Sequence, residues 1–425
     1  MKDRFDYIVI GSGAGGATIA RELTCKGKDV AVIEAGFPPN RLGTFRDGFD
    51  IYDLRGFLKT CRTSKEGIIL WRAMIGGGTT VVSCGNGIRC LEQELWQKGI
   101  QLQEELDETE QELGVAPIPE RFISHWTLNM AKTANSIGIT MVKMPKMINE
   151  EKCVRCGKCV FGCAYGAKWN AYQYLVEAVN NGADVFWECI ADKVVVENGK
   201  ECGVVCRRKR ETFTIFGQKI IVAAGGLGSP VLLKKSGIEN AGNNLFMDLF
   251  VNVYGIVDTM VASEPPMSLV CDAFLKEKGF ILSPFVNKHR LVRFKEMGMP
   301  GLLMQGKGLV GIMVKTRDDN QGTVYKNGLF SKIITPEDQK RLHDGVEMAK
   351  GILQRCGVIP TSIKISKIQG SHPGGTCAIG SVVNTSLETC IHNLFVCDAS
   401  ILPISPGLPP IVTIIALGKW LAKRI

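Results

Sequence analysis

Four closely spaced cysteines offer the most distinctive chemistry in this sequence. Cys153, Cys156, Cys159 and Cys163 stand in CVRCGKCVFGC, with the spacing C-x2-C-x2-C-x3-C. Thiolates at that density bind iron–sulfur clusters, and bacterial ferredoxins have the same spacing. Structural zinc usually takes two separated pairs of ligands and is the less favoured interpretation, and a disulfide is less favoured still. We predict a cluster here, closed by Cys163 or by a distant cysteine.

A glycine-rich turn near the N-terminus has the residues needed to bind a dinucleotide. Within residues 6–36 an apolar run precedes the turn GSGAGG, apolar positions with helical spacing follow it, and a second apolar run leads to Glu34. Gly11 permits the tight turn, Gly13 lets the backbone approach a pyrophosphate, and Gly16 lets helix and strand pack closely. Glu34 can accept the ribose hydroxyls. This stretch alone does not separate NAD from FAD.

Two further side chains stand where a ligand can reach them. His372 lies in GSHPGGTCAIG, and such a turn exposes a side chain to a cavity more readily than a helix face does, which suits a general base. Asp398 directly follows the apolar run LFVC, where a carboxylate can meet a ligand. Glycine-rich turns at 76–80 and 223–226 also expose backbone N–H groups suited to a polar cofactor.

These residues need elements that position them. The spacing of apolar residues predicts helices at 102–113, 122–137, 172–180 and 336–356, and strands at 183–189 and across 192–222. Strand-like runs at 245–261, 279–294 and 309–324 predict a second sheet. This middle region lacks glycine-rich cofactor motifs, so we expect it to hold the substrate. We expect loops at 37–63 and turns at 197–200 and near 207–210.

Composition indicates an ordinary globular protein. The 425 residues are 45% hydrophobic and 22% charged, with a net charge of +9. No signal peptide or membrane-spanning run is recognised, and the cysteines outside the cluster motif are scattered singly, so we expect a cytoplasmic, reducing location. The basic run 207–210 predicts a solvated hairpin tip, with docking of an acidic electron carrier as the alternative. Nucleic acid is not expected, because no recognition motif accompanies the run.

Four blocks, in this order, resemble the glucose–methanol–choline (GMC) family of FAD oxidoreductases, and together they span nearly the whole chain. They are GSGAGGATIARELTCKGKDVAVIEAG, RAMIGGGTTVV, IIVAAGGLGSPVLLKKSGI and HPGGTCAIG with the later LFVCDASILP and PPIVTIIALGKW. The resemblance implies FAD rather than NAD. It also implies oxidation of an alcohol by hydride transfer to the flavin, with His372 as the base.

The same resemblance implies a fold of α/β plus α+β class. It consists of a Rossmann-type FAD-binding domain assembled from separated segments, an antiparallel-sheet substrate domain and a cysteine-rich cluster segment. We expect FAD-binding segments at 1–90, 171–243 and 367–425, a helical segment with the cluster motif at 91–170, and the substrate domain at 244–366.

The family match also implies which residues hold the cofactor. The ADP half is expected near the first glycine-rich turn and Glu34, the flavin near 77–79, and the ribityl chain or pyrophosphate near Asp398. The full set of expected contacts is Gly11, Gly13, Ala14, Gly15, Gly16, Glu34, Ala35, Gly77, Gly78, Thr79, Ala224, Gly225, Asp398, Ala399, Pro410 and Ile411.

The cysteine block resembles that of the iron–sulfur-bearing GMC dehydrogenases of sugars, in which a cluster passes electrons from flavin to an external carrier. Those enzymes have three cluster cysteines and this chain has four, so [4Fe–4S] is at least as well supported as [3Fe–4S]. One departure concerns the second catalytic residue, which in the family is usually Asn or His just before the last helix. This chain has Pro409 there.

Three functions are compatible with these observations. The first is an FAD and iron–sulfur dehydrogenase of an alcohol that passes single electrons to a carrier such as ferredoxin or an electron-transfer subunit. The second is the reverse reaction, reduction of a C=O or activated C=C with electrons from a low-potential donor, which the proline at 409 slightly favours. The third is a non-catalytic electron-transfer subunit. The sequence does not decide whether the protein forms a homo- or a hetero-oligomer.

Overall fold

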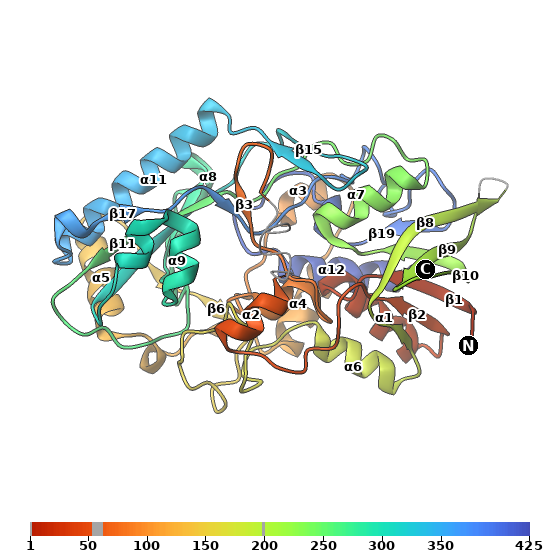
Figure 1. Ribbon diagram of the computed structural model, residues 1–425, viewed down its shortest axis with the longest axis horizontal. Helices are drawn as coiled ribbons and strands as arrows, with labels where there is room; N and C mark the ends of the chain where they lie inside the picture. The colour runs from red at the N-terminus through yellow and green to blue at the C-terminus, as the bar shows by residue number, and fades with distance from the viewer. Residues whose placement is uncertain (1, 53–62, 198–199) are drawn as a thin grey trace.

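The computed structural model describes residues 2–52, 63–197 and 200–425. Two sheets lie toward opposite ends of an elongated molecule, and both chain ends lie beside the first of them (Figure 1). The chain passes between the two sheets several times, so each sheet combines strands from distant parts of the sequence.

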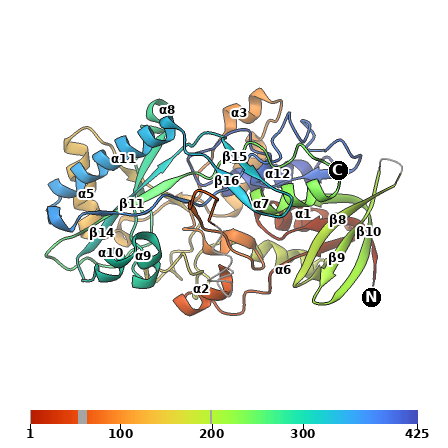
Figure 2. The same cartoon turned by 45° about the horizontal axis from the view of Figure 1, so that its top comes forward.

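The first sheet is parallel on one side and antiparallel on the other. Its parallel strands are β7 (Asp184–Phe186), β2 (Val30–Ile33), β1 (Arg4–Ile10), β10 (Glu211–Val222) and β19 (Leu394–Val396). The long strand β10 also pairs in antiparallel fashion with β9 (Lys200–Arg208), which pairs with β8 (Cys189–Glu197) (Figure 2). All residues of β2 are buried, as expected for a parallel strand covered on both faces.

Helices cover this sheet and begin close to its strand ends. They are α1 (Ala14–Cys25), α6 (Tyr172–Asn180), α7 (Gly225–Lys235) and α12 (Ile411–Ala422), and α4 (Gln103–Glu112) packs on α12. Every residue of α12 is buried, which accounts for its apolar sequence. Within the described residues, no helix combines the length and the apolar character needed to cross a membrane.

The second sheet is mainly antiparallel. Its order is β13 (Phe280–Pro284), β14 (Leu309–Thr316), β11 (Phe250–Ile256), β18 (Gln369–Gly370) and β3 (Ile69–Leu70), with β17 (Lys364–Ile365) also paired to β11. The helices α11 (Pro336–Arg355) and α5 (His125–Ser136) share one apolar cluster with these strands. Thr335 and Asp338 form a capping box that fixes the start of α11.

Short elements lie outside the two sheets and the helices named so far. They are α2 (Phe45–Ile51), α3 (Glu92–Gln97), α8 (Leu275–Lys278), β4 (Ala116–Pro117), β5 (Val142–Lys143), β6 (Pro145–Lys146), β12 (Leu269–Val270), β15 (Gly322–Val324) and β16 (Phe330–Lys332). The predicted loop region 37–63 therefore contains a helix, α2, which Thr44 and Asp47 start with a capping box. Its residues 53–62 lie outside the described part of the chain.

One predicted strand is wrong over half its length. The run 279–294 was expected to be a strand, but β13 ends at Pro284 and the helices α9 (Arg290–Met297) and α10 (Met299–Leu303) follow. The buried residues of α9 are Val292, Arg293 and Glu296, which have the spacing of one helix face. A short apolar run does not reveal this spacing, so a strand was predicted there. The runs 245–261 and 309–324 contain the expected strands, although β14 ends at Thr316 and β15 follows as a separate short strand.

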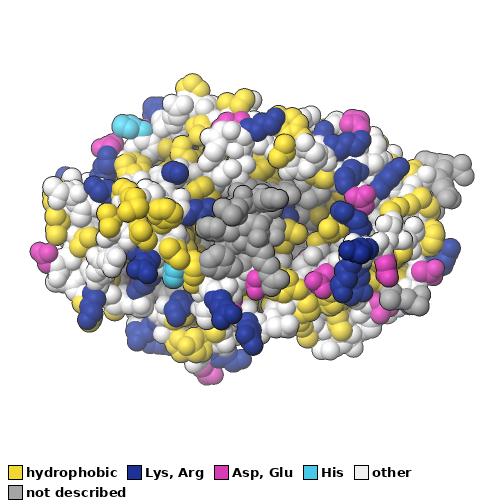
Figure 3. Space-filling view, in the orientation of Figure 1, with side chains coloured by type: hydrophobic (Ala, Val, Ile, Leu, Met, Phe, Trp, Pro, Cys, Tyr) yellow, Lys and Arg dark blue, Asp and Glu magenta, His cyan; other side chains and the backbone are white. Residues whose placement is uncertain are grey.

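Figure 3 shows hydrophobic side chains gathered over α9 and α10.

The predicted hairpin strands across 192–222 are confirmed as β8, β9 and β10. Arg207 and Arg208 end β9, and Lys209 and Arg210 form the turn to β10, with Lys209 in the left-handed region at φ 54°. The basic run therefore lies at a hairpin tip, as expected. The other predicted turn, at 197–200, includes residues 198–199, which lie outside the described residues.

Candidate active site

A cavity of about 910 Å³ is bounded by residues of both sheets. The glycine-rich turn after β1 contributes to its wall, and so does His372, which follows β18. Residues from the segments 223–235, 398–399 and 409–414 complete the wall on the side of the parallel sheet. The cavity thus brings together motifs that are up to about 400 positions apart in the chain.

The glycines of the first turn have two distinct roles. A Cβ atom on Gly16 would lie 1.9 Å from the carbonyl oxygen of Gly11, and one on Gly15 would lie 1.9 Å from that of Cys397. These two glycines therefore permit close packing of α1 on the strands. A Cβ atom on Gly13 would meet nothing within 4 Å, so this face of the turn is open toward the cavity. A ligand can approach the backbone there.

The second glycine-rich turn packs directly against the first. The backbone N–H of Gly77 donates to the hydroxyl of Ser12 at 3.1 Å. A Cβ atom on Gly78 would lie 3.0 Å from the Cα of Gly13. Gly78 and Thr79 line the cavity, whereas Gly77 and Gly16 are not part of its lining.

Glu34 holds the first turn through its carboxylate. One oxygen accepts from the backbone N–H of Ser12 at 2.9 Å and from its hydroxyl at 2.5 Å, and the other accepts from the N–H of Gly36 at 2.7 Å. Burial raises the pKa of this carboxyl, and these hydrogen bonds oppose that rise. Glu34 also lines the cavity, so it can meet a bound ribose while it orders the turn.

Asp398 has the same role at the start of α7. One carboxylate oxygen accepts from the backbone N–H of Gly225 at 2.7 Å and from the hydroxyl of Ser229 at 2.5 Å, and the other from the N–H of Ser400 at 2.7 Å. The remaining predicted cofactor contacts that line the cavity are Gly11, Gly15, Ala14, Ala35, Ala224, Gly225, Ala399, Pro410 and Ile411.

Three helices begin at the cavity wall. They are α1, α7 and α12, whose caps Gly13, Ala224 and Pro410 provide no side-chain hydrogen bond, and none has an acidic residue in its first turn. At α1 and α12 the first-turn N–H groups and the helix dipoles favour negative charge in the cavity, whereas at α7 the N–H of Gly225 already donates to Asp398. Together with the open face of Gly13, this arrangement fits the pyrophosphate and ring system of a flavin dinucleotide.

His372 is held by two charged side chains. Its Nδ1 lies 2.8 Å from Oδ2 of Asp248 and 3.0 Å from Nζ of Lys315. Both partners are buried, and Lys315 also lines the cavity. Burial and the Lys315 charge lower the pKa of His372 below its usual value, against the effect of Asp248.

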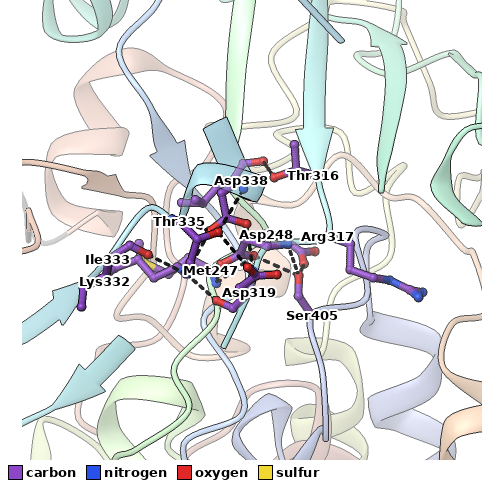
Figure 4. A network of polar contacts seen from close by, with 12 residues as sticks. Met247, Asp248, Thr316, Arg317, Asp319, Lys332, Ile333, Thr335, Asp338 and Ser405 are labelled. Carbon is purple, nitrogen blue, oxygen red and sulfur yellow. Dashed lines mark hydrogen bonds and ion pairs between the residues drawn. The ribbon is translucent and has the colours of Figure 1, made fainter. Parts of the chain in front are cut away.

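Asp248 is fixed from several sides. Oδ1 accepts from the hydroxyl of Ser405 at 2.6 Å and from the N–H of Gly407 at 3.0 Å. The Oγ of Ser405 accepts from the backbone N–H of Asp318 at 3.2 Å, and the Asp318 carboxylate pairs with Lys332 at 3.1 Å. Figure 4 shows Asp248 and Ser405 within this network of polar contacts. Asp248 has φ 47°, an uncommon conformation that the network holds in place.

The sequence reasoning missed Asp248 and Lys315. Each is a charged residue inside an apolar run, NLFMDLFV and GIMVKT, and such a residue is seldom buried without a partner. That pattern was the available signal. The partners could not be identified from it, because the three residues of this cluster are separated by 57 and 124 positions.

A second polar group lines another part of the cavity. The Glu296 carboxylate accepts from the hydroxyl of Tyr254 at 2.7 Å and from the amide of Asn287 at 3.0 Å. Burial raises the pKa of Glu296 to about 7. Apolar residues make up much of the surrounding wall, among them Trp71, Phe250, Met267, Phe285 and Met313.

The four clustered cysteines lie in the loop between β6 and α6, close to the cavity. All are partly buried, and Val160 and Phe161, which follow Cys159, line the cavity. Within the described residues, no three or more His, Cys, Asp or Glu side chains are arranged as a metal-binding group. The donor chemistry suits a cluster, but the thiols are not gathered as a ligand set.

Two buried lysines lie next to this loop. Lys168 donates to the carbonyls of Val81 and Ser83, both at 2.7 Å, and Lys146 donates to that of Pro266 at 2.7 Å. Neither forms an ion pair with a carboxylate in the part of the chain that the structure describes. Burial lowers the pKa of both lysines.

Comparison with known proteins agrees with this geometry. Residues 5–250 and 330–418 match the two family models described as GMC oxidoreductase, which together cover most of the chain. The chain belongs to the GMC oxidoreductase family. This family is a class of FAD-dependent enzymes.

Relatives of this GMC oxidoreductase are found in several kingdoms. A protein of Methanocaldococcus jannaschii described as uncharacterized is 32% identical over 99% of this chain and 100% of its own length. A long-chain-alcohol oxidase of Arabidopsis thaliana is 25% identical over 99% of this chain and 67% of its own length. Pyridoxine 4-oxidase from Mesorbium loti has a similar structure, with a TM-score of 0.78, 15% identity and 99% coverage of both chains. That last likeness shows a shared fold.

Proposed function

We propose that this GMC oxidoreductase oxidises an alcohol in the cavity, with His372 as the base that removes the hydroxyl proton. The observation that carries the proposal is the contact between His372 and Asp248 at the cavity wall. Bound FAD supplies the hydride acceptor. The relationship to a long-chain-alcohol oxidase of Arabidopsis thaliana supports this reaction class.

Asp248 and His372 have different roles in the proton transfer. A carboxylate can only accept hydrogen bonds, so Asp248 accepts one from the Nδ1–H of His372. The lone pair of the neutral ring is then on Nε2. That nitrogen can accept the hydroxyl proton of a substrate in the cavity. Because the pKa of His372 is lowered, the ring is neutral and ready to act as a base at neutral pH.

The cavity wall favours an alcohol with an apolar or aromatic body. Aromatic residues and methionines contribute apolar surface to this wall, and burial of such surface stabilises an apolar ligand. Glu296 and Asn287 can fix the orientation of one further polar group on the substrate. A small, fully hydroxylated sugar would leave much of this apolar wall without a partner.

We also propose that electrons leave through an iron–sulfur cluster on Cys153, Cys156, Cys159 and Cys163 to a carrier such as ferredoxin or an electron-transfer subunit. The ferredoxin-like spacing supports this, and [4Fe–4S] suits four ligands better than [3Fe–4S]. The unpaired charges of Lys146 and Lys168 also support it, since an anionic cluster nearby would offset them.

The reverse reaction, reduction of a carbonyl compound, is the second candidate. Pro409 lines the cavity where the family usually has a polar catalytic side chain, and it offers no side-chain hydrogen bond to a substrate alcohol. A low-potential donor would then deliver electrons to the same site.

The deciding experiment is anaerobic mixing of the purified holoenzyme with a panel of primary alcohols of increasing chain length and with aromatic alcohols. Loss of the flavin absorption band on mixing supports oxidation. Flavin that stays oxidised with every alcohol, but is reoxidised by an aldehyde after chemical reduction, supports the reverse direction. His372→Ala is the matched control and is expected to abolish either response while FAD remains bound.

A further inference from the structure

Lys315 is an unusual residue in the second sheet. It lies near the end of β14 between Val314 and Thr316, and only 2% of its side chain is exposed. Its ammonium group nevertheless lines the cavity beside His372. A buried ammonium is costly unless another charge compensates it, so its partners decide what it does.

Asp248 is the counter-ion of Lys315. The Nζ of Lys315 lies 3.8 Å from Oδ2 of Asp248, the only ion pair of this lysine within the described residues. The same carboxylate oxygen is 2.8 Å from Nδ1 of His372. The imidazole therefore lies against a buried pair of opposite charges.

Two arrangements of protons compete around a charged Lys315, because an ammonium only donates and a carboxylate only accepts. Nδ1 of His372 can accept from Lys315 at 3.0 Å or donate to Asp248 at 2.8 Å. We place the proton on Nδ1, since the contact with the Asp248 carboxylate is the shorter one. The Lys315 charge then opposes a second proton on the ring.

We propose that Lys315 is a positioning residue of the active site, which keeps His372 neutral while Asp248 holds the ring proton on Nδ1 and leaves Nε2 free to accept the substrate proton. The role of His372 as a base rests on the proposed function. Its protonation state can be measured without any substrate.

Other titratable groups that face this cluster come from several elements. Cys84 and Cys90, from the segment before α3, contribute to the electrostatic environment of Lys315. Asp318, which follows β14, acts on Asp248 but is itself paired with Lys332. Burial raises the pKa of both thiols, so they stay neutral near pH 7, and Asp248 remains the carboxylate in contact with Lys315 and His372.

The test is an NMR titration of the FAD-loaded protein with isotopically labelled histidine. The His372 signals are assigned by their loss in His372→Asn. In the wild type, the nitrogen shifts should show a proton on Nδ1 and none on Nε2 at pH 7, and the ring should gain its second proton only at a lower pH than an ordinary histidine does. An imidazolium at pH 7, or a neutral ring protonated on Nε2, would overturn the proposal without any need for a variant.

Two variants then separate charge from packing. Lys315→Met should raise the pKa of His372 by about one unit or more, because Asp248 then acts on the ring alone. Lys315→Arg keeps the charge and should leave the titration near that of the wild type. An unchanged or lowered pKa in Lys315→Met refutes the role of Lys315. In the pH dependence of kcat/KM, the acidic limb should move to higher pH only in Lys315→Met.

The proposal and the proposed function fail in different ways. If no alcohol reduces the flavin but the titration behaves as described, the assigned reaction is wrong and the role of Lys315 stands. If alcohols reduce the flavin but the pKa of His372 does not change in Lys315→Met, the reaction stands and the role of Lys315 is wrong.

Discussion

The Nδ1 atom of His372 lies 2.8 Å from Oδ2 of Asp248, a carboxylate 124 positions earlier in the chain. His372 follows β18 and Asp248 precedes β11, two strands that pair with each other in the second sheet. The pairing of these strands therefore places the acid against the base. Ser405 and Gly407 hold the acid from the segment that leads into α12.

Replacing this acid tests whether it orients the base. Asp248→Asn keeps the size of the side chain but removes its charge, so the Nδ1 proton of His372 loses its carboxylate partner. We expect the kcat for alcohol oxidation to fall by about 10²–10⁴-fold, with FAD retained. Asp258→Asn, at an exposed position, is the control and should keep full activity. Normal activity in Asp248→Asn would contradict the assignment.

Removal of the base is the second test. His372→Ala should lower the kcat by about 10²–10⁴-fold while the flavin spectrum of the purified protein stays that of the wild type. His343→Ala changes an exposed histidine on α11 and should have no effect. The measurement is stopped-flow reduction of FAD by an alcohol. Equal rates in the two variants would show that His372 is not the base.

Two substitutions that each add one methyl group separate the two roles of the glycines. Gly16→Ala would place its Cβ 1.9 Å from the carbonyl oxygen of Gly11 and should destabilise the fold by about 1–3 kcal/mol. Gly13→Ala meets no protein atom within 4 Å, so the apoprotein should lose less than about 1 kcal/mol. Its FAD content should nevertheless fall. Thermal unfolding and flavin content together check both expectations, and full FAD content in Gly13→Ala would argue against a cofactor at this face.

Cluster binding is tested by iron and sulfide analysis of anaerobically purified protein. About four irons per chain are expected for [4Fe–4S], with a brown absorption shoulder beside the flavin bands. Cys156→Ser should remove the iron and the reduction of an external carrier, while direct reduction of FAD by an alcohol continues. Cys390→Ser alters an exposed cysteine outside the motif and should keep the iron. Zinc, or no metal, in the wild type would rule the cluster out.

Glu296 should make the stability of the fold depend on pH. Burial raises its pKa to about 7, above the value near 4.3 expected in the unfolded chain. The stability is therefore fully present below about pH 4.3 and is lost as the pH rises through about 7, by up to about 3 kcal/mol. Urea unfolding of the wild type and of Glu296→Gln at pH 5 and pH 8 checks this. The variant should lose most of the difference, whereas Glu277→Gln, at an exposed position, should keep it.

Local patterns in the sequence determined much of the cofactor side of the molecule. Because a strand, a glycine-rich turn and a helix form a continuous local unit, the order of residue types from Asp6 to Glu34 is enough to predict where a dinucleotide binds. His372 and Asp398 were found for the same reason, since each stands in a turn directly beside a strand. The long amphipathic helix α11 followed from its spacing and its capping residues.

The tertiary structure alone decided which charges meet. Lys315, Asp248 and His372 come from three segments, and only the pairing of β14, β11 and β18 brings them together. The helix α9 was mistaken for a strand because a short apolar run does not distinguish the two, and contacts with the rest of the fold settle the matter. The sequence thus determined the glycine-rich turn, whose parts are neighbours along the chain, and the fold determined the cluster of His372, Asp248 and Lys315, whose members are neighbours only in space.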